Sequence, residues 1–295
     1  MKIPRSTQEM IPVKHILNDG TFVLDSGEYS KMFAFTDINY TELRDEEKMR
    51  RLVDYSALLN SIDKGIYAKI SIFFRPIRQE QFERDVLIPM NPEDELDDYR
   101  ENMNTVLREQ VRGTLGMTKQ AYLTITAGRR NDEDAAAFFA RVEGNLISSF
   151  QALGVELRAV PLSERLRLLH DIYRPGLEET FRYDAHAEKK LGMNWKDSIA
   201  PLSAEALNSC THLKIGGRYC KTLFLNAYPI YLNDRIVSDI ASIGKPMIFT
   251  IDFLPIPSAE AMAEAESRSM AIDTKIVNYT LHLSLIHISE PTRRS

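Results

Sequence analysis

The clearest chemical motif to test in this sequence is a glycine-led segment, GGRYCKT, at residues 216–222. Its Lys-Thr ending is that of a phosphate-binding loop, in which glycine N–H groups wrap the phosphate and the loop opens a helix. Cys220 stands where the second glycine belongs, however, and an apolar, strand-like run follows Thr222. A second Gly-Lys pair, at residues 244–245, is followed by proline. We therefore expect no nucleotide site and no cofactor in these residues.

Histidine and cysteine spacing predicts neither a metal site nor a nucleophile. No two histidines stand four apart, and the sequence holds no Cys-x-x-Cys and no Gly-x-Ser-x-Gly pattern. The histidines concerned are His15, His170, His186, His212 and His282. A hairpin turning on Gly216-Gly217 would place Cys220 opposite Leu213, away from Cys210, so we expect two reduced thiols and no disulfide.

The polar clusters favour structural roles. Residues 170–174, HDIYR, fall in the last turn of a predicted helix, where His and Arg suit the dipole. Arg165 and Arg167 could meet phosphate or an acidic partner, but a solvated helix surface is the favoured interpretation. The formal net charge of −5 lacks the basic footprint of a general nucleic-acid binder, although a local patch stays possible.

Composition is that of a globular chain. The 295 residues are 44% hydrophobic and 27% charged, and the length suggests two domains or more. No apolar run is long enough to span a bilayer and no signal-peptide pattern opens the chain, so we expect a cytoplasmic protein.

Residues 33–76 form the best-defined predicted unit, which is a strand, a helix and a second strand. Three acids at residues 45–47 suit the first helical turn, and Gly65 suits a left-handed helix end. Beyond Gly65 the apolar period changes from three or four residues to two, as in a half-buried strand. The predicted core faces are Met49, Leu52, Val53, Leu59 and Ile62 on the helix and Ile66, Ala68, Ile70, Ile72 and Phe74 on the strand.

Four residues are candidates for contacting a partner. Tyr67 and Phe73 are placed on the strand face opposite the core, where apolar side chains would be exposed. Arg129 and Arg130 follow the strand predicted at 119–127 and could meet phosphate or an acidic partner, although a solvated loop is favoured.

The other elements alternate between strand and helix. Strands flank a hairpin signal at residues 18–20, and helices are predicted after residues 91, 132 and 163. For the first of these helices we expect a buried stripe of Leu96, Tyr99, Met103, Val106 and Leu107. The alternation predicts a layered αβ domain, either split βαβ or doubly wound. The expected divisions are a β-meander (1–36), an αβ domain (37–175), a linker (176–201), a second, incomplete αβ unit (202–282) and a tail (283–295).

An ordered series of phrases carries a family resemblance. The series is FTDINYTELRDEEKMRRLVDYSALLNSIDKGIYAKISIFFR, then GVELRAVPLSERLRLLHDIYRPG, then GGRYCKTLFLNAYPIYLNDRIVSDI. It resembles the N-terminal region of the conjugative-transfer ATPases of type IV secretion systems, the TraE/TraC type or VirB class-four ATPases. The resemblance covers most of residues 30–282 and favours an α+β fold with mixed or antiparallel sheets and split βαβ, ferredoxin-like character in two subdomains.

The resemblance also implies a function. This region would dock the ATPase onto inner-membrane components of the secretion channel and onto neighbouring copies, in the cytoplasm at the membrane periphery, for transfer of DNA and protein. ATP and Mg²⁺ would belong to a motor domain that follows. Two alternatives stay open: a self-contained αβ enzyme acting on a small molecule at the strand ends after Phe74 and Ala127, and a nucleic-acid-binding module using the paired arginines.

The C-terminal residues look foreign to the rest. Residues 283–293, LSLIHISEPTR, resemble a translated transposase-type sequencing adapter and interrupt a predicted helix. We therefore expect a truncated fragment in which His287 has no function.

Overall fold

The computed structural model describes residues 6–37, 43–77, 79–111, 117–186, 190, 192, 194–206, 211–226, 236–256, 259–260 and 262–270. The predicted adapter tail and Cys210 lie outside these residues. Within them, no helix is both long and apolar enough to cross a membrane.

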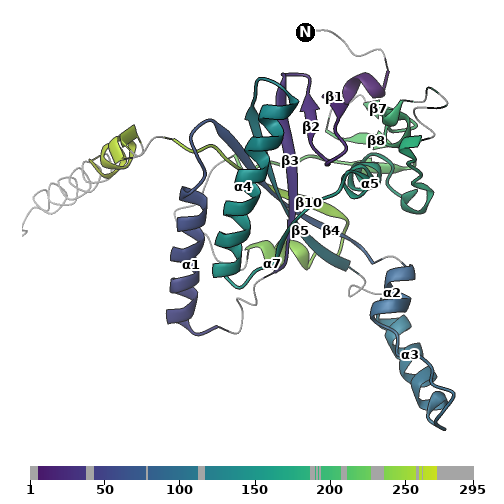
Figure 1. Ribbon diagram of the computed structural model, residues 1–295. Helices are drawn as coiled ribbons and strands as arrows, with labels where there is room; N and C mark the ends of the chain where they lie inside the picture. Colours follow the sequence, from purple (N-terminus) through teal and green to yellow (C-terminus); the bar gives the residue numbers. More distant parts are fainter. Residues whose placement is uncertain are drawn as a thin grey trace, which may run out of the picture.

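A seven-stranded antiparallel sheet is the centre of the molecule (Figure 1). Its order is β1-β2-β3-β5-β4-β10, and β6 also pairs with β3. The strands are β1 (Val13–Ile16), β2 (Phe22–Leu24), β3 (Glu28–Phe35), β4 (Ile66–Pro76), β5 (Met117–Gly128), β6 (Leu157–Ala159) and β10 (Met247–Phe253). The helices around it are α1 (Asp45–Asn60), α2 (Gln79–Asp85), α3 (Asp97–Val111), α4 (Asp132–Ala152), α5 (Leu162–Tyr173) and α7 (Ile236–Ala241).

The strand order confirms the predicted split βαβ arrangement. Helix α1 connects β3 to β4, and β5 is inserted between these two strands. After β5 the chain repeats the pattern through α4 to β6, which pairs with the other edge of β3. This βαββαβ order is ferredoxin-like and belongs to the α+β class.

One face of the sheet carries the main core. Figure 1 shows α1 and α4 side by side over this face. Asn131 begins α4 by accepting a hydrogen bond from the Asp134 N–H at 2.8 Å. Phe139 is fully buried and Leu58 nearly so, in the same cluster as Leu123 of β5.

The predicted core face of α1 is only partly correct. Ile62 is buried and Leu59 packs against the core, but Met49, Leu52 and Val53 are 63%, 56% and 61% exposed, and Leu58, which was not predicted, is buried. The helix therefore packs on the sheet through its C-terminal half, because its first turns extend past the described residues that could cover them.

The opposite face of the sheet is covered by α5. Leu168 packs with Phe73 and Tyr122 there. A neighbouring cluster joins Leu166 of α5 to β1 and β2 and to Trp195, which lies in a 3-10 turn, η3 (Trp195–Ser198). Both faces of the sheet are therefore part of a core.

Gly20 makes the predicted hairpin between β1 and β2 possible. Its φ is +83°, in the left-handed region, and an added Cβ would lie 2.6 Å from the Val160 oxygen. The hairpin thus packs directly against the chain between β6 and α5.

The predicted domain division does not follow the sheet. Strands β1–β3 and β10, from the two flanking divisions, pair with strands of the central one. The expected linker at 176–201 is also partly core, because Trp195, Ile199 and Ala200 are buried. Outside the main sheet, β7 (Ala204–Ala206), β8 (Leu213–Ile215) and β9 (Arg218–Cys220) form a small sheet in which Leu213 lies opposite Cys220, as the predicted hairpin requires.

Candidate interaction surface

A helical arm, residues 79–111, projects away from the sheet (Figure 1). It consists of α2, an irregular turn and α3. The sequence predicts a helix beginning directly after Asn91, but α3 begins at Asp97. The reason is local: the side chains of Asn91 and Asp94 accept hydrogen bonds from the N–H groups of Glu93 at 3.2 Å and Leu96 at 3.0 Å, which stabilises a turn instead.

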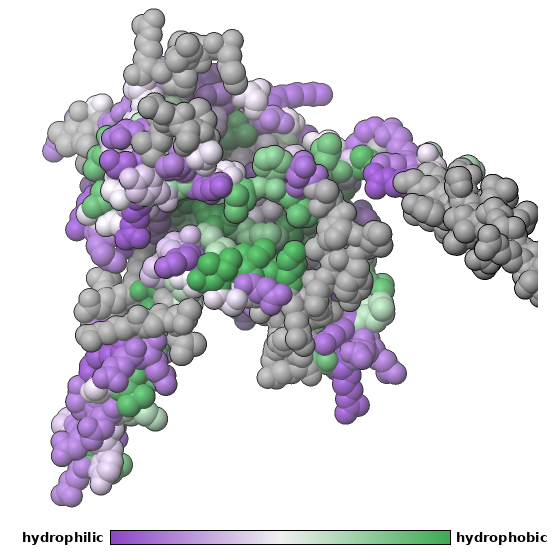
Figure 2. All heavy atoms as spheres, turned by 180° about the vertical axis from the view of Figure 1, so that it is seen from behind, coloured by the Kyte–Doolittle hydropathy of each residue, from purple (hydrophilic) through white to green (hydrophobic). Residues whose placement is uncertain are grey.

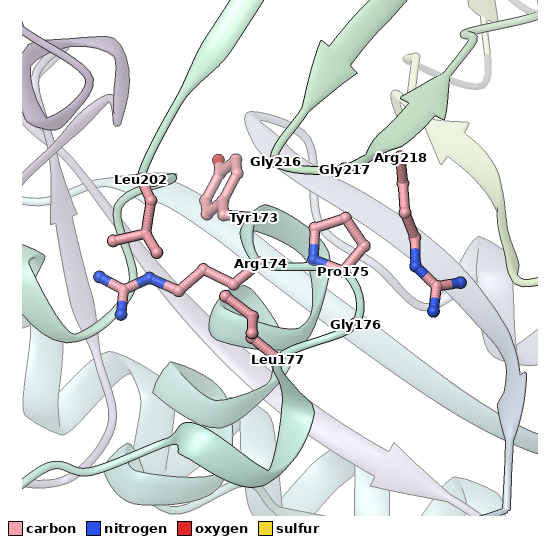
Figure 3. A pocket seen from close by; sticks show the side chains of 9 residues that line it. All are labelled: Tyr173, Arg174, Pro175, Gly176, Leu177, Leu202, Gly216, Gly217 and Arg218. Carbon is pink, nitrogen blue, oxygen red and sulfur yellow. The ribbon is translucent and has the colours of Figure 1, made fainter.

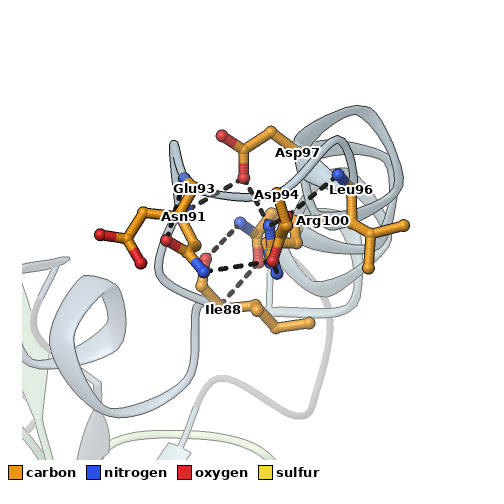
Figure 4. Close-up of polar contacts among 8 residues, drawn as sticks. Ile88, Asn91, Glu93, Asp94, Leu96, Asp97 and Arg100 are labelled. Atoms are coloured by element: carbon orange, nitrogen blue, oxygen red, sulfur yellow. Dashed lines mark hydrogen bonds and ion pairs between the residues drawn. The ribbon is translucent and has the colours of Figure 1, made fainter.

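Arg100 holds this turn against α3 (Figure 4). Its guanidinium donates to both carboxylate oxygens of Asp94 and, at 2.7 Å, to Asp97. The hydrogen bonds from Arg100 are the main reason that the pKa of Asp94 falls to about 2. The tip of the arm is therefore closed by charge-assisted hydrogen bonds.

Asn104 holds the base of the same turn. It is 2% exposed; its Nδ2 donates to the Ile88 oxygen at 2.9 Å, and its Oδ1 accepts from the Ile88 N–H at 2.8 Å. A buried amide that satisfies a backbone N–H and C=O at once fixes one geometry. The turn of the arm is thus held by polar contacts, and Phe82 of α2 adds a buried apolar side chain to the arm.

The apolar stripe of α3 is displayed to solvent. Its members, which we call the arm stripe, are Leu96, Tyr99, Met103 and Val106, with exposed fractions of 52%, 73%, 52% and 47%. The prediction that these four side chains are buried is wrong, because the arm projects and leaves them exposed. Leu107, the fifth predicted member of the stripe, is half-buried. Figure 2 shows apolar side chains among the hydrophilic ones of the projecting arm. An ordered helix with an uncovered apolar stripe is typical of a docking surface.

Of the two predicted strand candidates, the structure leaves only Tyr67 accessible. Tyr67 is 37% exposed, and burial together with a hydrogen bond to Asp252 of β10 raises its pKa. The expected exposure of Phe73 is wrong: it is 8% exposed and packs edge-on against Tyr122 at 5.3 Å between ring centroids. Sequence periodicity placed Phe73 on the correct face but could not show that α5 covers that face.

The two arginine candidates, Arg129 and Arg130, also differ in whether their side chains are accessible. The Arg129 guanidinium stacks 3.5 Å from the Phe138 ring centroid, so this arginine is committed to the fold. Arg130 is exposed, and its backbone N–H donates to Asp134. The two arginines therefore do not form one exposed basic pair, because only Arg130 is exposed.

Arg165 is buried, against the expectation of a solvated helix surface. It donates to the backbone oxygens of Gly20 and Ser30 and to the Ser30 hydroxyl, and it stacks on Phe22. Burial lowers its pKa to about 9. Arg165 therefore joins α5 to the β1–β2 hairpin and is not available to an external phosphate.

His170 is likewise a residue of the core. It is fully buried, its ring packs edge-on against Phe181, and burial lowers its pKa. The neighbouring Asp171 accepts a hydrogen bond from Arg75 of β4 at 2.7 Å. This cluster connects α5 to the sheet, which agrees with the structural role favoured above.

Two surface hollows of the described residues could hold a small molecule. One, of about 340 Å³, lies between the end of α5 and the β8–β9 turn, where Arg174 and Arg218 point to opposite sides (Figure 3). Its lining residues include no carboxylate, imidazole or thiol. The other, of about 680 Å³, lies at the strand ends of β3 and β5, where Lys119 is ion-paired with Asp37. The second hollow is also lined by Glu156, and neither hollow is lined by a histidine or a cysteine.

No protein-family model matches this chain, and a search of curated proteins finds no match. The resemblance to conjugative ATPases therefore stays a prediction. The arm stripe is the candidate docking feature whose exposure periodicity alone did not predict. The available signal in the sequence was Asn104 in the middle of α3, since an asparagine there suggests a polar contact.

Proposed function

We propose that this chain is the non-motor, N-terminal docking region of a conjugal-transfer ATPase of a type IV secretion system. It holds the ATPase on inner-membrane components of the secretion channel and beside neighbouring copies, in the cytoplasm at the membrane periphery. ATP and Mg²⁺ act in the motor domain of the parent protein.

The observation that supports this proposal is the arm. Arg100 and Asn104 hold α3 in one geometry while the arm stripe stays uncovered. A preorganised surface loses little conformational freedom when it binds. The sequence resemblance supplies the assembly in which such a surface would be used.

The alternatives have less support. A small-molecule enzyme needs convergent catalytic groups in a pocket. Neither hollow described above is lined by a histidine or a cysteine, and in the second the Asp37 carboxylate is ion-paired with Lys119. A nucleic-acid module needs available cations, and both Arg129 and Arg165 are engaged within the fold.

The test is capture of the chain by tagged inner-membrane channel components of a conjugative system. We expect the unaltered chain to be retained, and a variant with Leu96→Ser, Tyr99→Ser and Met103→Ser to lose more than about 90% of this retention, because polar side chains remove the apolar contact. Met49→Ser with Val53→Ser is the matched control, since it alters exposed apolar residues of α1, and it should be retained. Absence of the unaltered chain from the captured material would contradict docking.

A further inference from the structure

The arm carries an excess of negative charge beside its apolar stripe. The arginines that the structure describes in the arm are all ion-paired within it: Arg84 with Asp85, Arg100 with Asp94 and Asp97, and Arg108 with Glu101. Four exposed carboxylates have no ion pair among the described residues, namely those of Glu93, Glu95, Asp98 and Glu109. A partner of the arm stripe should therefore be apolar and flanked by cations.

A second surface of the same chain has that character. We call residues 218–225 the basic segment; it comprises β9 and the irregular chain that follows. Its apolar side chains are Tyr219, Leu223, Phe224 and Leu225, with exposed fractions of 69%, 78%, 84% and 52%. Arg218 and Lys221 are both exposed, and neither has an ion pair in the described part of the chain. Consecutive apolar residues this exposed indicate an interaction site.

We propose that the arm of one copy binds the basic segment of a second copy of this chain. The arm stripe would pack on the apolar side chains of the segment, while Glu95 and Asp98 would face Arg218 and Lys221. This inference rests on the proposed docking function and assigns the arm stripe to the neighbouring copy. The loss of channel retention expected for the serine variant of the arm stripe would then follow from loss of the assembly of copies that the channel retains.

The arm and the basic segment of one copy lie apart, so the arm would bind the basic segment of a second copy. Figure 1 shows the arm at the opposite end of the molecule from β7 and β8, which belong to the same small sheet as β9. The hydrogen bonds of Arg100 and Asn104 hold the turn of the arm in one geometry. Two different surfaces are joined in this contact, so it is heterologous and can extend from copy to copy.

Sedimentation velocity of the purified chain tests the proposal. We expect association that increases with protein concentration and weakens as salt rises, since exposed charges are screened. An arm variant, Glu95→Lys with Asp98→Lys, and a segment variant, Arg218→Glu with Lys221→Glu, should each associate at least about tenfold more weakly.

Mixing these two variants is the decisive step. The altered arm of one would then match the altered segment of the other, and the unaltered arm of the second would match the unaltered segment of the first. The equimolar mixture should therefore recover association in which the two variants alternate. Recovery in the mixture also shows that both variants are folded. Glu260→Lys with Glu266→Lys makes the same change in net charge as the arm variant, at other exposed sites, and should associate like the unaltered chain.

Three outcomes would overturn the inference: an unaltered chain that is monomeric at every concentration, variants that associate normally, or a mixture that stays monomeric. A chain that binds channel components but remains monomeric overturns this inference alone. A chain that self-associates but is never captured by the channel overturns the proposed function instead.

Discussion

The sheet and the arm are both built with amphipathic helices, but they are stabilised by different contacts. Helix α4 buries Phe139 and Leu146 against the sheet. Helix α3 is held by Asn104 and Arg100 and leaves its apolar stripe in solvent. An amphipathic helix therefore predicts that its apolar side makes a contact, but it does not show whether that contact is made within the same chain or with another molecule.

Removing an apolar side chain from each region should give the largest difference. Phe139→Ala leaves a cavity in a fully buried position and should lower the free energy of unfolding by about 3–5 kcal/mol. Met103→Ala, at a half-exposed position of the arm stripe, should change it by less than about 0.5 kcal/mol. Urea denaturation measures both values, and equal losses would show that the arm stripe is buried.

A change at the base of the arm should act locally. Asn104→Ala removes both hydrogen bonds to Ile88 and should cost about 1 kcal/mol in the stability of the turn. Hydrogen exchange at residues 86–90 should become faster while the melting temperature of the sheet is unchanged. Asn102→Ala, on the exposed side of α3, serves as the control. A global loss as large as that of Phe139→Ala would mean that arm and sheet unfold together.

The smallest effect is expected in how the free energy of unfolding of the sheet region depends on pH, through His170. Burial lowers the pKa of His170, although Asp171 and Glu178 oppose the shift, and Arg174 adds to it. As pH falls below about 6.5, the ordinary histidine pKa, the unfolded chain gains a proton that the folded chain still excludes. The free energy of unfolding should therefore decrease with falling pH until the lowered folded pKa is passed.

His170→Gln should reduce this pH dependence between pH 7 and 5.5, where carboxylates elsewhere are ionised. His15→Gln is the control, because the side chain of His15 is 45% exposed. An unchanged slope in His170→Gln would assign the pH dependence to other groups. The stability of the arm, measured by hydrogen exchange, should not show this dependence on pH.

Most of the main sheet could be predicted from the sequence. The strands from β1 to β5 fall where the two-residue period and the hairpin signal place them, because alternation is a property of the local chain. The acidic first turns of α1 and α4 could be predicted in the same way. The pairing of strands across the predicted domain divisions could not be predicted, because β10 and β4 are far apart in the sequence and no local pattern indicates that they pair.

The candidate site was less predictable. The arm stripe was recognised as apolar, and Tyr67 and Phe73 were correctly assigned to one strand face. Whether a face is covered depends on distant residues: α5 covers Phe73, while no described element covers Met103.

By itself, the sequence determined most of the strands and helices of the sheet region and which sides of them are apolar, since these properties depend on neighbours a few positions away. Only the tertiary structure decided that Arg165 is a core residue and that α3 stands clear of the sheet. The physical reason is that burial is a relation between segments, so the same apolar spacing becomes a core in α4 and an exposed docking surface in the arm.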